Sequence, residues 1–278
     1  MDRNSKIYFT AGRLLVALLF ICMGIDCFVS VGTLNNAVPT FMGAPTLWVT
    51  LLGIGWLMVG GCFLLNLLTR PAAVVATLSI TLILAMSTYR GFASADAFIP
   101  TVLSFAFYFA FMGCAMMIGW PAQRVFRLEC PAIEDLFYAG RILMGIFFFT
   151  AGWLHFDNIK GDAAMMGDFP GSVFWVLFIG ICWFAVSFSF FTNIMARTAG
   201  TLASLVLILI ILVINFKAFG KDDTWSVIYQ IVRTLGVMGG CLLVASRGYY
   251  GLHVKSWWWP PVKWGWDLPK PESIESVK

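Results

Sequence analysis

The sequence predicts an all-α integral membrane protein with eight transmembrane helices, arranged as two tandem parallel four-helix bundles. The chain is 60% hydrophobic and only 12% charged, whereas soluble domains carry about 25% charged residues. Its apolar runs are continuous and do not alternate with polar residues, which favours helices over a barrel. The third observation is that nearly the same residue pattern occurs twice along the chain.

The repeat extends over most of the chain. Residues 11–28 (AGRLLVALLFICMGIDCF) reappear 128 positions later as residues 139–156 (AGRILMGIFFFTAGWLHF). From Trp48 onward the spacing is 127, so that Trp48 matches Trp175 and Trp56 matches Trp183. A fixed period over this length indicates an internal duplication. We therefore expect a first repeat over residues 1–127, a second over 128–250, and a tail over 251–278.

Each repeat supplies four apolar runs of about the 20 residues that a helix needs to cross a bilayer. The expected spans lie at 8–30, 46–69, 71–89 and 97–119, and then at 136–156, 172–193, 198–216 and 225–246. The first and fifth spans are followed by segments 31–45 and 157–171, which we expect to be loops. The connections at 70–71 and 197 are very short, so the helices on either side should be antiparallel neighbours.

The distribution of Lys and Arg predicts the orientation. Only Arg90, Lys160, Lys217 and Lys221 fall on one side of the predicted membrane, and nearly all the others fall on the side of the two termini. This bias places both termini in the cytoplasm, and we expect a multi-pass protein of a bacterial cytoplasmic (inner) membrane. The first span lacks a small-residue cleavage site and is interpreted as a retained helix. Since topology accounts for the net charge of +4, we expect no nucleic-acid partner.

The tail is rich in tryptophan and proline. Its aromatic cluster consists of Trp257, Trp258, Trp259, Trp264 and Trp266. Tryptophan favours the headgroup region of a bilayer, and it is also enriched in binding hot spots. The tail is therefore interpreted either as an interfacial anchor or as a docking segment for another membrane subunit.

Two arginines, Arg13 and Arg141, occupy equivalent positions inside the first span of each repeat. Charges within a membrane are costly and suggest a function, but a long arginine side chain can also reach the headgroups. Because both repeats keep the arginine, a structural role in the shared fold is the favoured interpretation.

Three further residues are candidates for binding a ligand. Asp26 and His155 lie near the outer ends of the first and fifth spans, where they could bind a quinone head group, relay protons or simply be solvated at the interface. Arg233 lies two turns inside the last span, where the first repeat has Ala106. It needs a partner, and Asp26 or Asp157 is the expected one.

Familiar catalytic patterns are missing from the sequence. It contains no P-loop, no nucleophile elbow, no zinc-protease motif and no dinucleotide fingerprint. None of the seven cysteines forms a C-x-x-C pair, and we expect no metal site. We therefore lean toward a protein that is not itself an enzyme.

The pattern Arg-x10-Gly-x2-[Cys/His]-Phe resembles the DoxX-like family. It occurs first as Arg13, Gly24, Cys27 and Phe28, and again around His155. The second copy is closer, since family members often carry a His at this point. The resemblance implies a four-helix unit of about 130 residues, and it points to the membrane subunit of thiosulfate:quinone oxidoreductase and to proteins of disulfide maturation. The replacement of that His by Cys27 and the lack of adjacent cysteines argue against a disulfide relay.

Three functional hypotheses follow. The first is a non-catalytic membrane subunit of a larger bacterial complex, linked to electron transfer. The second is a quinone-linked oxidoreductase membrane subunit of the thiosulfate:quinone oxidoreductase type, for which Asp26, His155 and Arg233 would form the site and quinone would be the cofactor. The third is a small-molecule transporter, suggested by the repeat symmetry. The expected partners are the lipid bilayer and other membrane protein subunits.

Overall fold

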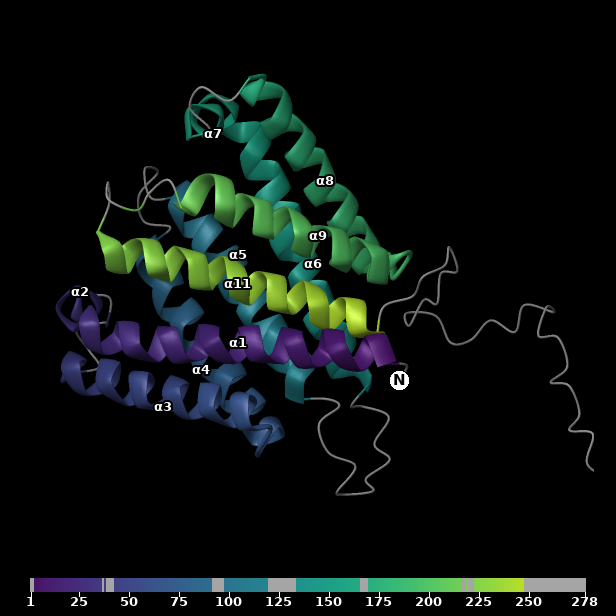
Figure 1. The fold of residues 1–278 in the computed structure, drawn as a ribbon. Helices are drawn as coiled ribbons and strands as arrows, with labels where there is room; N and C mark the ends of the chain where they lie inside the picture. Colours follow the sequence, from purple (N-terminus) through teal and green to yellow (C-terminus); the bar gives the residue numbers. More distant parts are fainter. Residues whose placement is uncertain are drawn as a thin grey trace, which may run out of the picture.

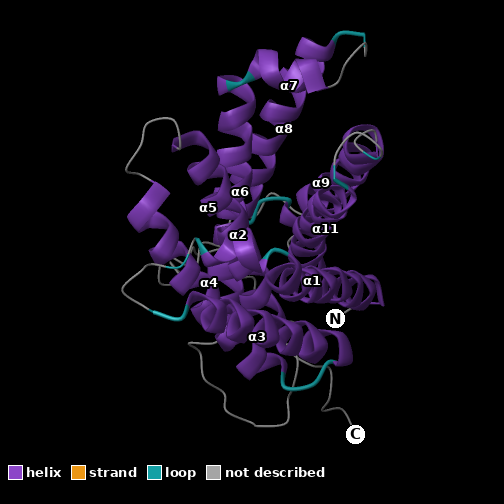
Figure 2. Ribbon diagram, turned by 90° about the vertical axis from the view of Figure 1, so that its left-hand side faces the viewer, coloured by secondary structure: helices purple, strands orange, loops and turns teal. Residues whose placement is uncertain are grey.

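The computed structural model describes residues 3–36, 38, 43–91, 98–119, 134–165, 170–216, 219 and 223–247. These residues are almost entirely helical, with no β-strand among them (Figure 2). The helices are α1 (Arg3–Val29), α2 (Val31–Asn35), α3 (Pro45–Leu65), α4 (Thr69–Gly91), α5 (Phe98–Gly119), α6 (Glu134–Asp157), α7 (Ile159–Met165), α8 (Ser172–Thr192), α9 (Ala196–Ile210), the π-helix η4 (Ile211–Asn215) and α11 (Thr224–Arg247).

Seven of these helices are long and apolar enough to cross a membrane: α1, α3, α5, α6, α8, α9 with η4, and α11. In α4 the described stretch Thr69–Ala85 is apolar as well. Many large apolar side chains on these helices face outward, among them Met58, Leu78 and Phe174. In a soluble protein such a surface would be exposed to water at great cost, and the structure is consistent with a multi-pass membrane protein.

The predicted loops after the first and fifth helices are partly wrong. Each contains a short helix, α2 or α7, and these begin at the equivalent residues Val31 and Ile159. Helices of this length carry too few residues to show an apolar period. In Figure 1, α2 lies beside the end of α1, and α7 lies at the top of the view, where α6 ends; we call the ends of α1 and α6 and the beginning of α11 the distal end.

The two repeats fold alike in detail. The buried residues of α8 lie 127 positions after those of α3, from Val49 and Val176 to Phe63 and Phe190. Each helix ends at an asparagine in the left-handed conformation, Asn66 with φ 57° and Asn193 with φ 61°. Asparagine tolerates this conformation better than other non-glycine residues, which explains why both repeats keep it before the short turn.

Each long helix packs against the next one around a closed ring, and the ring is closed by contacts between the two repeats. Within each repeat, neighbours along the chain pack together, but α1 makes few contacts with α5, and α6 makes few with α11. Instead α1 packs extensively along α11, and α5 packs along α6 (Figure 1). The fourth helices α5 and α11 also touch each other. The predicted arrangement of two self-contained four-helix bundles is therefore not confirmed, because the two halves share their helix contacts.

Glycines make these exchanged contacts close. A Cβ atom on Gly113 would lie 2.5 Å from the carbonyl oxygen of Gly140, and one on Gly140 would lie 2.5 Å from that of Gly113. Between α1 and α11, the corresponding distances are 2.6 Å for Gly12 and 2.8 Å for Gly239. Only glycine permits backbones to approach this closely.

Candidate functional site

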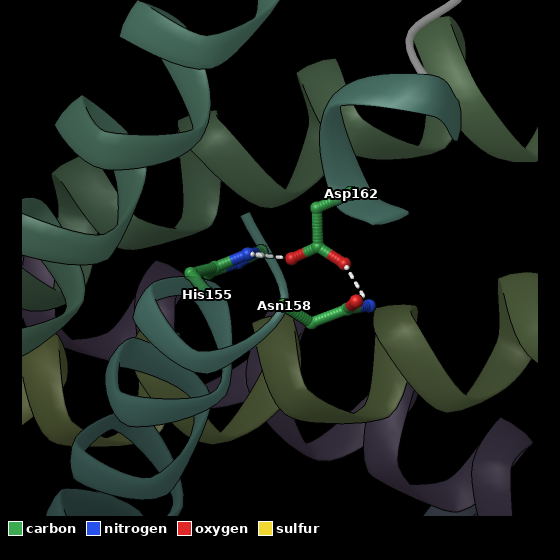
Figure 3. A network of polar contacts seen from close by, with 3 residues as sticks. All are labelled: His155, Asn158 and Asp162. Atoms are coloured by element: carbon green, nitrogen blue, oxygen red, sulfur yellow. Dashed lines mark hydrogen bonds and ion pairs between the residues drawn. The ribbon is translucent and has the colours of Figure 1, made fainter. Parts of the chain in front are cut away.

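A histidine–aspartate pair joins α6 to α7 at the distal end. The Nδ1 atom of His155 lies 2.5 Å from Oδ2 of Asp162. The amide of Asn158 donates a hydrogen bond of 3.1 Å to the other carboxylate oxygen (Figure 3). An ionised carboxylate only accepts hydrogen bonds, so the proton of the first bond resides on Nδ1. The carboxylate thus fixes the imidazole ring and leaves its Nε2 for another partner.

This pair lies at the distal end of an apolar cavity of about 220 Å³. The cavity is lined by side chains from both repeats, namely Leu103, Phe107, Phe147, Ala151, His155, Asp162, Val176, Ile179, Trp183, Leu207, Ile210, Ile214, Thr234 and Val237. The side chains of His155 and Asp162 are 27% and 21% exposed, so the polar end of the cavity also reaches the molecular surface. Such a combination of apolar walls and a few polar groups is typical of small-molecule sites.

The repeats differ in side-chain size at one position of the cavity lining. Ala151 lines the cavity, and its equivalent in the first repeat is Met23, whose side chain is fully buried. Likewise His155 corresponds to Cys27. Alanine is smaller than methionine, so at these two positions the second repeat offers more room and a polar ring.

Asp26 forms a separate polar contact, between α1 and α11. Its Oδ1 accepts hydrogen bonds from the indole Nε1 of Trp225 at 2.9 Å and from the hydroxyl of Ser30 at 2.8 Å. The carboxylate is half-buried at the distal end, and its hydrogen bonds tie the beginning of α11 to the end of α1. Asp26 therefore has a structural role that the sequence did not reveal.

Arg233 lies against aromatic rings. Its guanidinium carbon is 4.0 Å from the ring centre of Phe107 and 5.8 Å from that of Tyr229. Among the described residues no carboxylate lies within 4.0 Å of it, so the expected ion pair with Asp26 or Asp157 is not formed. Cation–π contact replaces it. Phe107 also lines the cavity, so the arginine lies behind one wall of the cavity and not inside it.

The paired arginines of the first helices lie toward the other end of the molecule. Arg141 is 1% exposed, and its guanidinium carbon lies 5.1 Å from the ring centre of Tyr138. Arg13 is half-buried. A third arginine that the sequence analysis did not single out, Arg197, donates a hydrogen bond of 3.1 Å to Ser5 across the two repeats. The structural role of Arg13 and Arg141 stays a prediction.

The remaining features considered in the sequence are the tail tryptophans, the cysteines and a metal site. The tryptophans from Trp257 to Trp266 lie outside the described residues. Six cysteines are described, and all are free thiols. No group of three His, Cys, Asp or Glu side chains that could hold a metal ion occurs within the described ranges.

Sequence analysis named His155, Asp26 and Arg233 but did not predict their surroundings. Asp162 was visible only as one of several acids in a presumed loop, and no spacing rule connects it to His155 across the turn between α6 and α7. Nothing in the sequence around Trp225 indicated its contact with Asp26. Comparison of Ala151 with Met23 was the one signal that could have located the cavity in advance.

Comparisons with known proteins supply no identification: the chain matches no family model, no curated protein and no solved structure.

Proposed function

We propose that this chain is the quinone-binding membrane subunit of a larger bacterial electron-transfer complex. In this proposal α4 is the eighth membrane span, both termini lie in the cytoplasm, and the distal end faces away from it. The observation that carries the proposal is the apolar cavity of about 220 Å³ with the His155–Asp162 pair at its distal end. The resemblance of the segment around His155 to DoxX-like proteins is in keeping with it.

The residues present fit a quinone head group. The aromatic and aliphatic walls, including Phe147 and Trp183, suit a flat apolar ring. A quinone supplies reversible two-electron, two-proton chemistry at its ring oxygens. His155 can offer Nε2 to such an oxygen, and Asp162 holds the ring in place through its hydrogen bond with Nδ1. The half-buried Asp162 and the exposed Asn158 lie between this end of the cavity and the molecular surface. This chain thus binds and orients the ligand, and electrons are exchanged with a redox centre on another subunit.

Binding is tested directly with purified protein in phosphatidylcholine nanodiscs, titrated with ubiquinone-2 by calorimetry. Ala151→Met places the residue of the first repeat in the cavity and should lower affinity about tenfold or more, which corresponds to about 1.4 kcal/mol. Met23→Leu, a volume-conserving change at the equivalent position, should leave binding unchanged. Equal affinity of wild type and Ala151→Met would refute the cavity as the site.

Assembly into a complex is tested separately. Purification in mild detergent from the native membrane, followed by mass spectrometry of co-migrating proteins, should yield stoichiometric partners that include a redox protein. A chain that migrates alone under conditions that preserve known membrane complexes would contradict the subunit part of the proposal.

A further inference from the structure

A second hollow lies on the outer surface beside the cavity, between α8 and α9. It has a volume of about 300 Å³ and is lined only by apolar side chains: Trp175, Phe178, Ile179, Val206, Leu209, Ile210, Val213 and Ile214. The two helices meet at their short connection and splay apart toward the distal end (Figure 1). Phe178 and Leu209 are largely exposed, so this groove faces the lipid in a membrane.

The groove and the cavity share three lining residues. Ile179 of α8, Ile210 of α9 and Ile214 of η4 line both, and all three are half-buried. The two spaces are therefore separated by these side chains and not by a layer of backbone. Isoleucine side chains can change rotamer on a nanosecond timescale when they are not fully packed.

The backbone next to this partition is irregular. Residues 211–215 form a π-helix, and the N–H of Phe216 donates to the carbonyl of Ile211, five residues earlier. The equivalent segment of the first repeat, residues 84–88, is ordinary α-helix within α4. A π turn inside an α-helix is rare and is frequently found at functional sites. In addition, α8 packs far less extensively on α9 than on α6, so this is the looser side of the cavity.

We propose that Ile179, Ile210 and Ile214 form a lateral gate through which a lipid-soluble quinone enters from the bilayer, and that the groove then holds its isoprenoid tail. The inference rests on the proposed function. The occupant is identified by the continuity of the groove with the cavity. The quinone head group needs the polar end at His155, and the groove offers only apolar contacts to the isoprenoid tail attached to that head group. A tail-less quinone has a second route, because His155 and Asp162 are partly exposed at the distal end.

The test uses two probes, ubiquinone-2 with its isoprenoid tail and the tail-less ubiquinone-0, on protein in nanodiscs. In Ile179→Trp the indole should fill the partition, so affinity for ubiquinone-2 should fall about tenfold more than affinity for ubiquinone-0, which has the second route. Leu52→Trp, at the equivalent position of the first repeat, is the matched control and should bind both probes normally. Ile214→Ala should open the gate and raise the association rate of ubiquinone-2 in stopped-flow measurements.

The outcomes separate the two proposals. If wild type does not bind ubiquinone-2, the proposed function itself fails. If it does, the gate is overturned when Ile179→Trp keeps full affinity for ubiquinone-2, and equally when the substitution weakens both probes by the same factor. If Ile179→Trp does not fold, the association rate of ubiquinone-2 with Ile214→Ala is the deciding measurement. A rate equal to that of wild type overturns the gate.

Discussion

At the scale of single residues, two of the differences between the halves lie in the lining of the candidate site. Ala151 and His155 stand where the first repeat has Met23 and Cys27, which gives these positions a smaller side chain and an imidazole. The sequence shows that these residues differ, but it does not show whether a cavity results. A smaller side chain leaves a cavity only where the neighbouring residues do not fill the space.

Asp162 is expected to act through His155. Asp162→Asn keeps the shape but removes the negative charge that accepts the hydrogen bond from Nδ1–H of His155. Hydrogen bonds to charged groups contribute about 1.5 kcal/mol or more, so ubiquinone-2 affinity should fall about tenfold. Calorimetry in nanodiscs measures this change. The exposed neighbour Asp157 provides the control, and an equal loss in Asp157→Asn would show that the effect is only one of surface charge.

Asp26, by contrast, is expected to contribute to stability. Trp225→Phe keeps an aromatic ring but removes the Nε1–H donor at 2.9 Å. Leaving a half-buried carboxylate without this donor should lower the free energy of unfolding by about 1.5 kcal/mol. Thermal unfolding in detergent measures the loss against Trp153→Phe, which alters a largely exposed tryptophan. If both variants unfold together with wild type, the Asp26–Trp225 bond does not secure α11 to α1.

At the scale of the elements, apolar runs placed the long helices well. The expected span 172–193 corresponds to α8, Ser172–Thr192, and 225–246 corresponds to α11, Thr224–Arg247. Run length is a strong signal because a bilayer requires it. The short helices α2 and α7 and the π-helix η4 gave no such signal, since five to seven residues are too few to establish a repeating apolar pattern.

The glycine contact between α5 and α6 should be the most sensitive to substitution. Gly113→Ala would bring Cβ to 2.5 Å from the Gly140 carbonyl oxygen, so the helices must separate. Overpacking of this kind costs about 1–3 kcal/mol, and the thermal unfolding temperature should fall. Gly55→Ala is the matched control, because nothing lies within 4 Å of the added atom. A Gly113→Ala protein as stable as the Gly55→Ala protein would contradict the close crossing.

At the scale of the whole molecule, the duplication was predictable but the exchange of partners was not. A helix that is apolar on nearly all sides does not reveal which face meets protein and which meets lipid. The choice of α11 over α5 as the neighbour of α1 depends on Gly12 meeting Gly239 and on Trp225 reaching Asp26. These contacts join residues about 200 positions apart, and a single sequence contains no record of them.

This exchange predicts that neither half is sufficient alone. When residues 1–127 and 128–278 are expressed as separate chains, the α1–α11 and α5–α6 contacts are available only if both are present. The co-expressed halves should co-purify and unfold as one unit, whereas each half alone should aggregate or self-associate. Size-exclusion chromatography in detergent would contradict this if each half eluted as a stable monomer with no affinity for the other.

The central claim is that the second repeat holds a quinone in the cavity between Ala151 and His155. The most direct measurement is mass spectrometry and ultraviolet absorbance of the organic extract from protein purified out of its native membrane. The account predicts quinone near stoichiometric amounts in wild type and its loss from Ala151→Met, with Met23→Leu retaining it. Quinone no more abundant in the wild-type extract than in that of Ala151→Met would contradict the claim.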